Sequence, residues 1–298
     1  MITKIVNSPS RFFSPLRYPG GKAVLASYLE YVITHKCSGE VTYVEPYAGG
    51  AGAALSLLLT EVVDRVVIND LDTSIYAFWK SVVHETERFV DCIEATEVTI
   101  DEWERQKLLY HNSHSDFEIG FATFFLNRTN RSGLLNGGPI GGKDQSGTWK
   151  IDARFNKDEL IRKISRIGQY RSRIEVKNTD GIRLADQTLT NDRCFLYLDP
   201  PYVVKGYDLY MNHYSTNDHK DLAAILNSHS DSTWLLSYDN VELIRQLYSR
   251  RVSVELSIKY HADTSKIGSE ILVFSDKISR KEPNNDFNLT PGASPVAG

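Results

Sequence analysis

The sequence predicts an α/β protein with a seven-stranded, mostly parallel sheet and an inserted, mainly helical domain. Three observations lead to this prediction. Seven short runs of apolar and β-branched residues recur along the chain, helix-like stretches separate most of them, and about a hundred residues between Ile75 and Arg173 break the alternation. Strands that alternate with helices form parallel sheets with helices on both faces.

Seven segments are expected as strands. They are residues 41–44, 65–68, 174–176, 194–198, 233–237, 252–256 and 271–274. Helix-like stretches at 51–59, 218–226 and 241–248 connect strands that we expect to run parallel. A polar, glycine-containing loop with no clear helix joins the last two strands, which allows the last strand to return antiparallel.

The break in the alternation defines the expected domains. Residues 1–75 and 174–280 form one domain, and residues 76–173 form the inserted one. The insertion is expected as helices, then a loop with six glycines at 132–148, then helix again. Residues 281–298 are rich in Asn, Pro, Gly, Ser and Ala, which bury no core, so we expect a disordered tail.

Charge is distributed unevenly along the chain. The net charge is −4, but residues 126–177 carry twelve Lys and Arg against five acids. A basic segment within an acidic protein is what a surface that contacts phosphates requires. Taken alone, a solvated helix face would explain the same charges.

Cysteines and apolar runs limit the expected compartment. Cys37, Cys92 and Cys194 are far apart and form no CxxC pair, so we expect buried thiols in a reducing cytoplasm and no metal site. No stretch of about 18 apolar residues occurs, and residues 1–11 contain no apolar signal core. We therefore expect a cytoplasmic protein that neither spans a membrane nor is secreted.

Two polar turns follow the first two expected strands. The first, residues 44–52, contains Gly49 and Gly50, whose missing side chains let backbone approach a ligand closely. A dinucleotide fingerprint counted from Gly50 requires Gly or Ala where Leu55 stands, which disfavours a nicotinamide dehydrogenase. Asp70 closes the next strand 21 residues after Gly49, and an acid there commonly accepts hydrogen bonds from ribose.

A third turn, residues 196–202, leads from an apolar strand into Asp199, two prolines and Tyr202. Consecutive prolines stop a strand and fix the backbone. The Asp199 carboxylate and the Pro200 carbonyl are then rigid acceptors for the two hydrogens of an exocyclic amine. With both hydrogens held, the nitrogen lone pair can attack a methyl sulfonium, and Tyr202 offers a face on which the base can stack.

These motifs resemble those of Dam-type adenine-specific DNA methyltransferases over residues 15–275. In that family a cofactor motif comes first, a target-recognition domain is inserted, and a DPPY motif, here residues 199–202, follows. The resemblance implies a Rossmann-like methyltransferase fold, S-adenosylmethionine as the cofactor, and N6 methylation of an adenine flipped out of double-stranded DNA. Residues 136–142 differ from the hairpin of GATC-reading members, so no recognition sequence is implied.

The turns, the basic segment and the resemblance together indicate the site residues. Catalysis is expected at Asp199, Pro200 and Tyr202. The expected cofactor contacts are Tyr18, Gly20, Lys22, Glu45, Tyr47, Gly49, Gly50, Asp70, Asp180 and Asp199. The expected DNA contacts are Asn127, Arg128, Asn130, Arg131, Asn136, Lys143, Gln145 and Lys150. Among these, the cations are suited to phosphates and the amides to base edges.

Other activities remain open. By resemblance, Ser in place of Asp199 is typical of cytosine enzymes and Asn of amide enzymes, so methylation of cytosine N4 or a protein amide is less favoured. Methylation of RNA adenine is a further alternative, which the inserted basic domain disfavours. From another class comes a DNA-binding protein with a vestigial cofactor site. The expected partners are double-stranded DNA and a cognate restriction or defence-system component.

Overall fold

The computed structural model describes residues 13–17, 25–203, 214–259 and 267–279, so the expected tail lies outside the described residues. Its centre is one seven-stranded sheet in the order β3-β2-β1-β4-β5-β7-β6. The strands are β1 Thr42–Glu45, β2 Arg65–Asn69, β3 Ile174–Lys177, β4 Cys194–Leu198, β5 Trp234–Asp239, β6 Val252–Lys259 and β7 Ile267–Phe274. The seven strands predicted from the sequence are confirmed.

Parallel pairing dominates the sheet. β1 pairs in parallel with β2 and β4, β2 with β3, and β4 with β5. β7 lies between β5 and β6 and is antiparallel to both, which confirms the antiparallel return of the last strand. The strand order reverses between β1 and β4. Open α/β sheets bind ligands at such a switch point, beyond the carboxyl ends of the strands.

Alternation along each strand divides the core into two layers. Tyr43 faces one layer, whereas its neighbour Val44 faces the other. The first layer is covered by α1 Ala26–Lys36, α2 Gly52–Leu59, α3 Thr73–His84 and α12 Asp276–Ser279. The second is covered by α8 Gly181–Leu189, α10 Thr216–Ser228 and α11 Glu242–Leu247. The sheet is therefore buried on both faces, as parallel sheets are.

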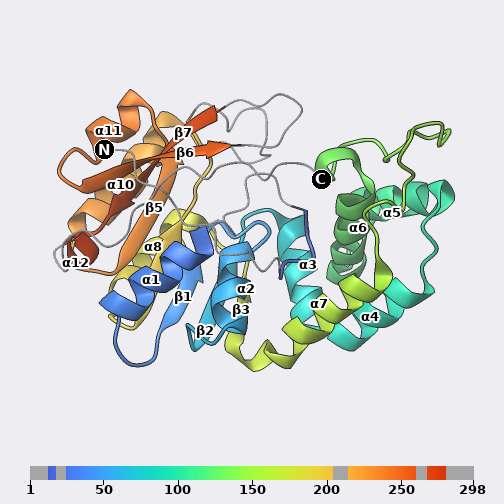
Figure 1. Ribbon diagram of the computed structural model, residues 1–298, viewed down its shortest axis with the longest axis horizontal. Coiled ribbons are helices and arrows are strands. Elements are labelled where there is room, and N and C mark those ends of the chain that lie inside the picture. Colours follow the sequence, from blue (N-terminus) through green and yellow to red (C-terminus); the bar gives the residue numbers. More distant parts are fainter. Residues whose placement is uncertain (1–12, 18–24, 204–213, 260–266, 280–298) are drawn as a thin grey trace, which may run out of the picture.

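Four further α-helices follow α3 before the chain returns to the sheet. They are α4 Thr86–Ala95, α5 Ile100–Asn112, α6 Asp116–Thr129 and α7 Lys157–Gln169. α6 packs closely on α3 at Gly120, where a side chain would collide with the Ala77 carbonyl. The rings of Phe78, Phe89 and Phe124 fill the space beside this contact. Figure 1 shows α4 to α7 gathered beyond α3, on the side of the molecule away from β6 and β7.

Polar residues at the helix starts explain where these helices begin. Asp72, Thr99, Ser115 and Asn156 each accept a backbone N–H in the first turn of α3, α5, α6 and α7. Such caps satisfy amides that have no partner within the helix. Among the described residues, no helix has the length and apolar character needed to cross a membrane.

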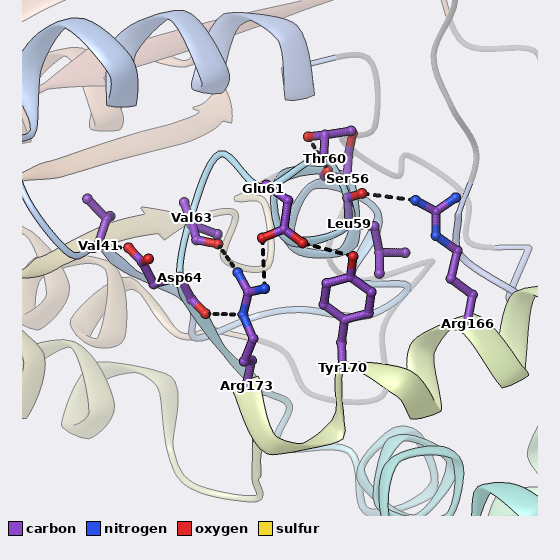
Figure 2. Close-up of polar contacts among 10 residues, drawn as sticks. All are labelled: Val41, Ser56, Leu59, Thr60, Glu61, Val63, Asp64, Arg166, Tyr170 and Arg173. Atoms are coloured by element: carbon purple, nitrogen blue, oxygen red, sulfur yellow. Dashed lines mark hydrogen bonds and ion pairs between the residues drawn. The ribbon is translucent and has the colours of Figure 1, made fainter.

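A clasp of polar contacts fastens the end of this helical segment to the connection between α2 and β2 (Figure 2). Arg173 donates to the carbonyls of Val63 and Asp64 at 2.9 and 2.6 Å and pairs with Glu61 at 2.7 Å. The Tyr170 hydroxyl donates to the same Glu61 carboxylate at 2.8 Å. β3 therefore joins the sheet in a fixed register, which brings the residues after β3 beside the end of β2.

Candidate active site

Polar side chains of four strands meet at one end of the sheet. Glu45 ends β1, Asp199 follows β4, Ser237 lies in β5, and Glu270 lies in β7 opposite the last residue of β5. Each stands an even number of residues from a member of the first core layer in its strand, so all four project from the same face. This end is where the parallel strands present their carboxyl termini.

Hydroxyl groups hold Asp199. Ser237 Oγ donates to Asp199 Oδ1 at 2.7 Å, and the Tyr197 hydroxyl lies 2.9 Å from Ser237 Oγ. The Tyr202 hydroxyl lies 3.2 Å from the same Asp199 oxygen and 2.7 Å from Glu270 Oε1. The carboxylate predicted to act on a substrate is therefore fixed in orientation by its neighbours.

The turn after Asp199 is supported by other strands. Pro200 is buried, and Pro201 and Tyr202 are half-buried. Asp239, at the end of β5, accepts a hydrogen bond from the Val203 N–H at 3.1 Å. Burial holds the pKa of Tyr202 well above its usual value, and the nearby carboxylates raise it further. The Tyr202 hydroxyl therefore stays protonated at neutral pH.

The glycine turn after β1 is fixed from two sides. The Gly49 N–H donates to Asp70 Oδ2 at 2.8 Å, and Trp79 Nε1 donates to the Gly49 carbonyl at 2.8 Å. Gly49 has a φ of 47°, in the left-handed region that favours glycine. Asp70 Oδ1 accepts from the Asp72 N–H at 3.0 Å. Burial raises the pKa of Asp70 to about 6, against the effect of these two backbone bonds.

Asn69 links three segments at the same end of the sheet. Its Nδ2 donates to the carbonyls of Pro46 and Thr179 at 2.8 and 2.9 Å, and its Oδ1 accepts from the Thr179 N–H at 2.9 Å. Asn178 in turn donates to the Asp70 carbonyl at 2.7 Å. The ends of β1, β2 and β3 thus form one hydrogen-bonded unit.

Glu45 lies inside the protein, at the end of β1 just before the glycine turn. Its side chain is 5% exposed, and the Tyr43 hydroxyl donates to its Oε1 at 2.8 Å. Burial raises the pKa of Glu45 to about 8; the Tyr43 bond opposes this rise and the charge of Asp199 adds to it. The predicted contact of Glu45 with a cofactor stays a prediction.

Other predicted cofactor residues surround this unit. The Tyr47 hydroxyl lies 2.6 Å from that of Tyr214, and its ring packs against Gly181, where a side chain would collide with it. Asp180 is exposed and caps α8 by accepting from the Arg183 N–H at 2.9 Å. The structure brings together Glu45, Tyr47, Gly49, Gly50, Asp70 and Asp180 at the ends of β1, β2 and β3. Tyr18, Gly20 and Lys22 lie outside the described residues.

Most of the predicted DNA contacts lie in residues 130–151, which we term the stapled loop because its own side chains hold it. Asn127, just before it, is 3% exposed. Its Oδ1 accepts from the Arg17 N–H at 2.7 Å, and its Nδ2 donates to the Gly133 carbonyl at 2.9 Å. Gly133, at a φ of 75°, comes so close to the Arg17 carbonyl that a side chain would collide with it. The Asn127 amide therefore anchors the start of the loop.

Two more amides fasten the stapled loop. Asn130 is fully buried, accepts from Trp103 Nε1 at 2.7 Å and donates to the Leu134 carbonyl at 2.8 Å. Gln145 Nε2 donates to the Ile140 carbonyl at 2.8 Å, and its Oε1 accepts from the backbone N–H of residue 151 at 2.8 Å. The structure thus places both amides in bonds within the chain, whereas they were predicted to contact DNA.

The predicted cations and the remaining amide are more accessible. Lys143 pairs with the exposed Glu104 at 2.9 Å, and Lys150 donates to two loop carbonyls at 2.6 and 3.0 Å. Arg131 is exposed, and its Nε lies 3.4 Å from the Pro139 carbonyl. Asn136 is exposed, and within the described part of the chain its side chain makes no hydrogen bond. These four side chains can reach a ligand in solution.

Arg128 lies among other arginines. It is half-buried, and its Nε donates to the Arg154 carbonyl at 2.6 Å. Burial lowers the pKa of Arg128 to about 10, and the charges of Arg17 and Arg154 lower it further. Burial and Arg154 likewise lower the pKa of Arg17. Three guanidinium groups are therefore close enough to repel one another.

The sequence reasoning assigned no role to several residues of this site. Asn69, Trp79, Ser237, Asp239 and Glu270 hold the turns in place, and Arg17 and Arg154 join Arg128. One signal was present for Glu270, because an acid is rarely buried and this one directly precedes the apolar run Ile271 to Phe274. Nothing in the sequence pairs Trp79 with a glycine 30 residues earlier.

The sheet order and the polar residues at the strand ends define a Rossmann-like α/β protein with a candidate ligand site at the switch point of the sheet. A family model of the D12 class N6 adenine-specific DNA methyltransferases matches residues 18–267. The chain belongs to this family and is an adenine-specific DNA methyltransferase. The resemblance found in the sequence and the predicted methyltransferase fold are confirmed.

More distant likenesses were found among solved structures. Two structures of the rRNA methyltransferase aviRa from Streptomyces viridochromogenes are similar at 13% and 12% identity, with TM-scores of 0.36 and 0.39. Each comparison covers 94% of this chain and 92% of the other. TM-scores of this size do not define a fold, which here follows from the sheet order and the family. No match was found among curated proteins.

Proposed function

We propose that this enzyme transfers the methyl group of S-adenosylmethionine to N6 of an adenine flipped out of double-stranded DNA. One observation carries the proposal. Asp199 stands at the switch point of the sheet with one carboxylate oxygen fixed by Ser237, and the ring of Tyr202 follows three residues later. A fixed acceptor beside a flat ring is suited to a planar amine, because it need not reorganise as charge develops.

The residues at the ends of β1 and β2 fit S-adenosylmethionine. Gly49 and Gly50 add no side chain to the turn, so a cofactor could approach it closely. Asp70 is an acid at the position where ribose hydroxyls are commonly bound. Beside it, Leu71 is 45% exposed, an apolar side chain suited to cover an adenine ring. When bound, the cofactor supplies a methyl group on a positively charged sulfur.

Ten residues are proposed to hold the cofactor. They are Tyr18, Gly20, Lys22, Glu45, Tyr47, Gly49, Gly50, Asp70, Asp180 and Asp199. Of those described, Glu45 acts from inside the protein, since its carboxyl group is buried against Tyr43. Asp70 would have two roles. Its oxygens hold the turn by accepting backbone N–H groups, and their remaining lone pairs would accept hydrogen bonds from ribose hydroxyls.

The chain's own residues prepare the amine for attack. Asp199 would accept one amine hydrogen and the Pro200 carbonyl the other, so that the nitrogen lone pair leaves its conjugation with the ring. Tyr202 would stack on the flipped base and offset part of the unstacking, which costs a few kcal/mol. Positioning and charge stabilisation would then carry the reaction, in which the nitrogen–carbon bond would form as the sulfur–carbon bond breaks, a neutral thioether would leave, and the surplus amine proton would pass to solvent.

DNA binding is proposed to centre on residues 76–173, as an inserted target-recognition domain. Arg17, Arg128 and Arg154 repel one another, and a phosphate between them would relieve that repulsion. Arg131, Lys143 and Lys150 are proposed as further phosphate contacts, and Asn136 as a base contact. Asn127, Asn130 and Gln145 would contribute by shaping the stapled loop.

Asp199→Ala tests the proposed chemistry. It removes an acceptor aimed at the amine, and such losses typically lower the rate about 100- to 1000-fold. The measurement is tritiated-methyl transfer to duplex DNA, followed by mass spectrometry of the nucleosides. Asp186→Ala, at an exposed acid on α8, is the matched control and should keep the parent rate. Label on cytosine, or on RNA in preference to duplex DNA, would contradict the proposal.

Two parts of the proposal concern the setting of the enzyme. A reducing cytoplasm suits the three cysteines, which are free thiols and are half-buried, whereas they were expected to be buried. A restriction or defence-system component is proposed as partner on the strength of family membership alone. Co-purification with the tagged enzyme from its native host tests the partner.

A further inference from the structure

Glu270 is a fully buried acid in a strand that otherwise contributes apolar side chains to the core. It is 0% exposed, whereas Leu272 and Phe274, on the same face of β7, belong to the apolar core. An acid at such a position is unfavourable unless hydrogen bonds hold it. Its Oε1 accepts from the Tyr202 hydroxyl at 2.7 Å, which ties it to the turn that carries Asp199.

The hydroxyl of Tyr202 lies between two carboxylates but has one hydrogen to donate. Glu270 Oε1 is 2.7 Å away and Asp199 Oδ1 is 3.2 Å away, so the hydrogen belongs to Glu270. Asp199 Oδ1 instead takes its hydrogen bond from Ser237, at 2.7 Å. The distances therefore assign the Tyr202 hydroxyl hydrogen to Glu270 and the Ser237 hydroxyl hydrogen to Asp199.

We propose that Glu270 is a positioning residue that draws the Tyr202 hydroxyl hydrogen away from Asp199, so that Asp199 keeps its acceptor capacity for the target amine. This inference rests on the proposed function, because it concerns how the same site prepares an amine. Without the Glu270 carboxylate, the Tyr202 hydroxyl still has a charged acceptor within reach, because Asp199 Oδ1 lies 3.2 Å away. A hydrogen bond gained there competes with the substrate for the same carboxylate.

A second contact shows that the turn is held as a unit. Asp239, which pairs with Glu270 across β5 and β7, accepts from the Val203 N–H at 3.1 Å. The hydroxyl of residue 202 and the amide of residue 203 are thus both bound by acids of the same strand pair. The Tyr202 hydroxyl is therefore held by a residue of β7 as well as by its place in the turn.

The test compares Glu270→Gln, Tyr202→Phe and the double variant. A neutral amide oxygen is a weaker acceptor than a carboxylate, so in E270Q the hydroxyl turns toward Asp199 and the single-turnover methylation rate falls about tenfold. The double variant has no hydroxyl to compete. It should regain the rate of Y202F, at least about fivefold above E270Q.

Rescue by the second substitution separates positioning from a structural role. If Glu270 only stabilises the fold, removing the Tyr202 hydroxyl as well cannot raise the rate, and a double variant no faster than E270Q overturns the inference. So does an E270Q rate equal to that of the parent. Glu270→Met, of similar length, with and without Y202F, supplies the same comparison if E270Q does not fold.

The parent enzyme in the same assay tells the two hypotheses apart. If it labels no adenine in duplex DNA, the proposed function fails. If it labels adenine and loses that activity in D199A, but the double variant shows no rescue, the proposed function stands and the role of Glu270 fails.

Discussion

The strand-end site and the stapled loop use polar side chains in opposite ways. At the strand ends, Asp199 and Asp70 are bound by groups from other segments, such as Ser237 in β5 and Gly49 after β1. In the stapled loop, Gln145 and its neighbours bind carbonyls a few residues away in the same segment. The sheet sets the geometry of the first region, whereas bonds within the loop, with Trp103 and Arg17 at its start, set that of the second.

The two regions also differ in what they contribute to stability. Burial raises the pKa of Glu45 and of Asp70, so their charged forms are held at a cost in folding free energy. The loop amides are satisfied by neighbouring backbone, and each bond stabilises the fold. The strand-end site therefore has an electrostatic cost in folding free energy, whereas the hydrogen bonds of the stapled loop add to stability. The following predictions test this contrast.

The largest effect is expected from Glu45→Gln. The pKa of Glu45 rises from an ordinary 4.5 to about 8 on folding. The folded state therefore holds the proton more tightly, and the parent loses stability as pH rises from about 4.5 to about 8. By linkage the loss is at most about 5 kcal/mol. Urea unfolding at pH 5 and pH 8.5 should show E45Q equal to the parent at the lower pH and more stable at the higher.

The other carboxyl group with a raised pKa supplies the control. Asp70 titrates near 6 in both proteins, so its contribution cancels in the difference between them. Equal pH dependence of the parent and E45Q would mean that Glu45 is not buried in its charged form. The strand-end site would then have no electrostatic cost in folding free energy from Glu45.

In the loop, Asn130→Ala should destabilise the fold by about 3 kcal/mol. It leaves the buried Trp103 N–H and the carbonyls of Leu134 and Leu135 without their partner, and each such loss costs about 1 to 3 kcal/mol. Asn136→Ala is the matched control, since that side chain is exposed, and should change stability by less than about 0.5 kcal/mol. Chemical denaturation measures both. Equal effects would show that the loop is not held by its amides.

This contrast explains why the strand-end site could be predicted from the sequence more completely than the stapled loop. The strands and the DPPY turn were predictable because apolar runs and prolines act locally and because parallel strands present their carboxyl ends together. The role proposed for Asp199 was inferred from its neighbours in the chain. The ends of most elements were predicted to within one or two residues for the same reason, as β4 Cys194–Leu198 shows.

What the sequence did not reveal depends on contacts between distant segments. Trp79 bonds to Gly49, and Glu270 to Tyr202, across 30 and 68 residues. In the loop the difficulty was different. An amide that is buried against nearby backbone and an amide that is exposed to solvent look alike in sequence. Asn130 and Asn136 could therefore be told apart only by their burial in the structure.

A smaller effect is expected from Asp70→Ala on cofactor binding. Charge-assisted hydrogen bonds contribute about 1.5 to 3 kcal/mol each, so calorimetry should show affinity for S-adenosylmethionine reduced about 10- to 150-fold. Trp79→Phe is the informative control, because it loosens the same turn from the opposite side without removing an acid. If W79F weakens binding as much as D70A, the carboxylate matters only for the shape of the turn. Unchanged affinity in D70A would remove Asp70 from the cofactor site.

The smallest effect is expected at the arginine cluster beside the stapled loop. Arg154 is exposed, and its side chain shares a cluster with Arg17 and Arg128, whose Nε binds only the backbone carbonyl of residue 154. Arg154→Ala therefore removes one charge and keeps that carbonyl bond. If a phosphate sits among the three guanidinium groups, the slope of log affinity against log salt should fall by about one.

Fluorescence anisotropy with a labelled duplex at several salt concentrations measures this slope, with Arg162→Ala, an exposed arginine on α7, as the control of equal charge. Equal slopes in the two variants would leave the cluster without a role in binding phosphate. A lower slope in R154A alone, with the same methylated sequence, would show that this cluster binds the DNA backbone and reads no base.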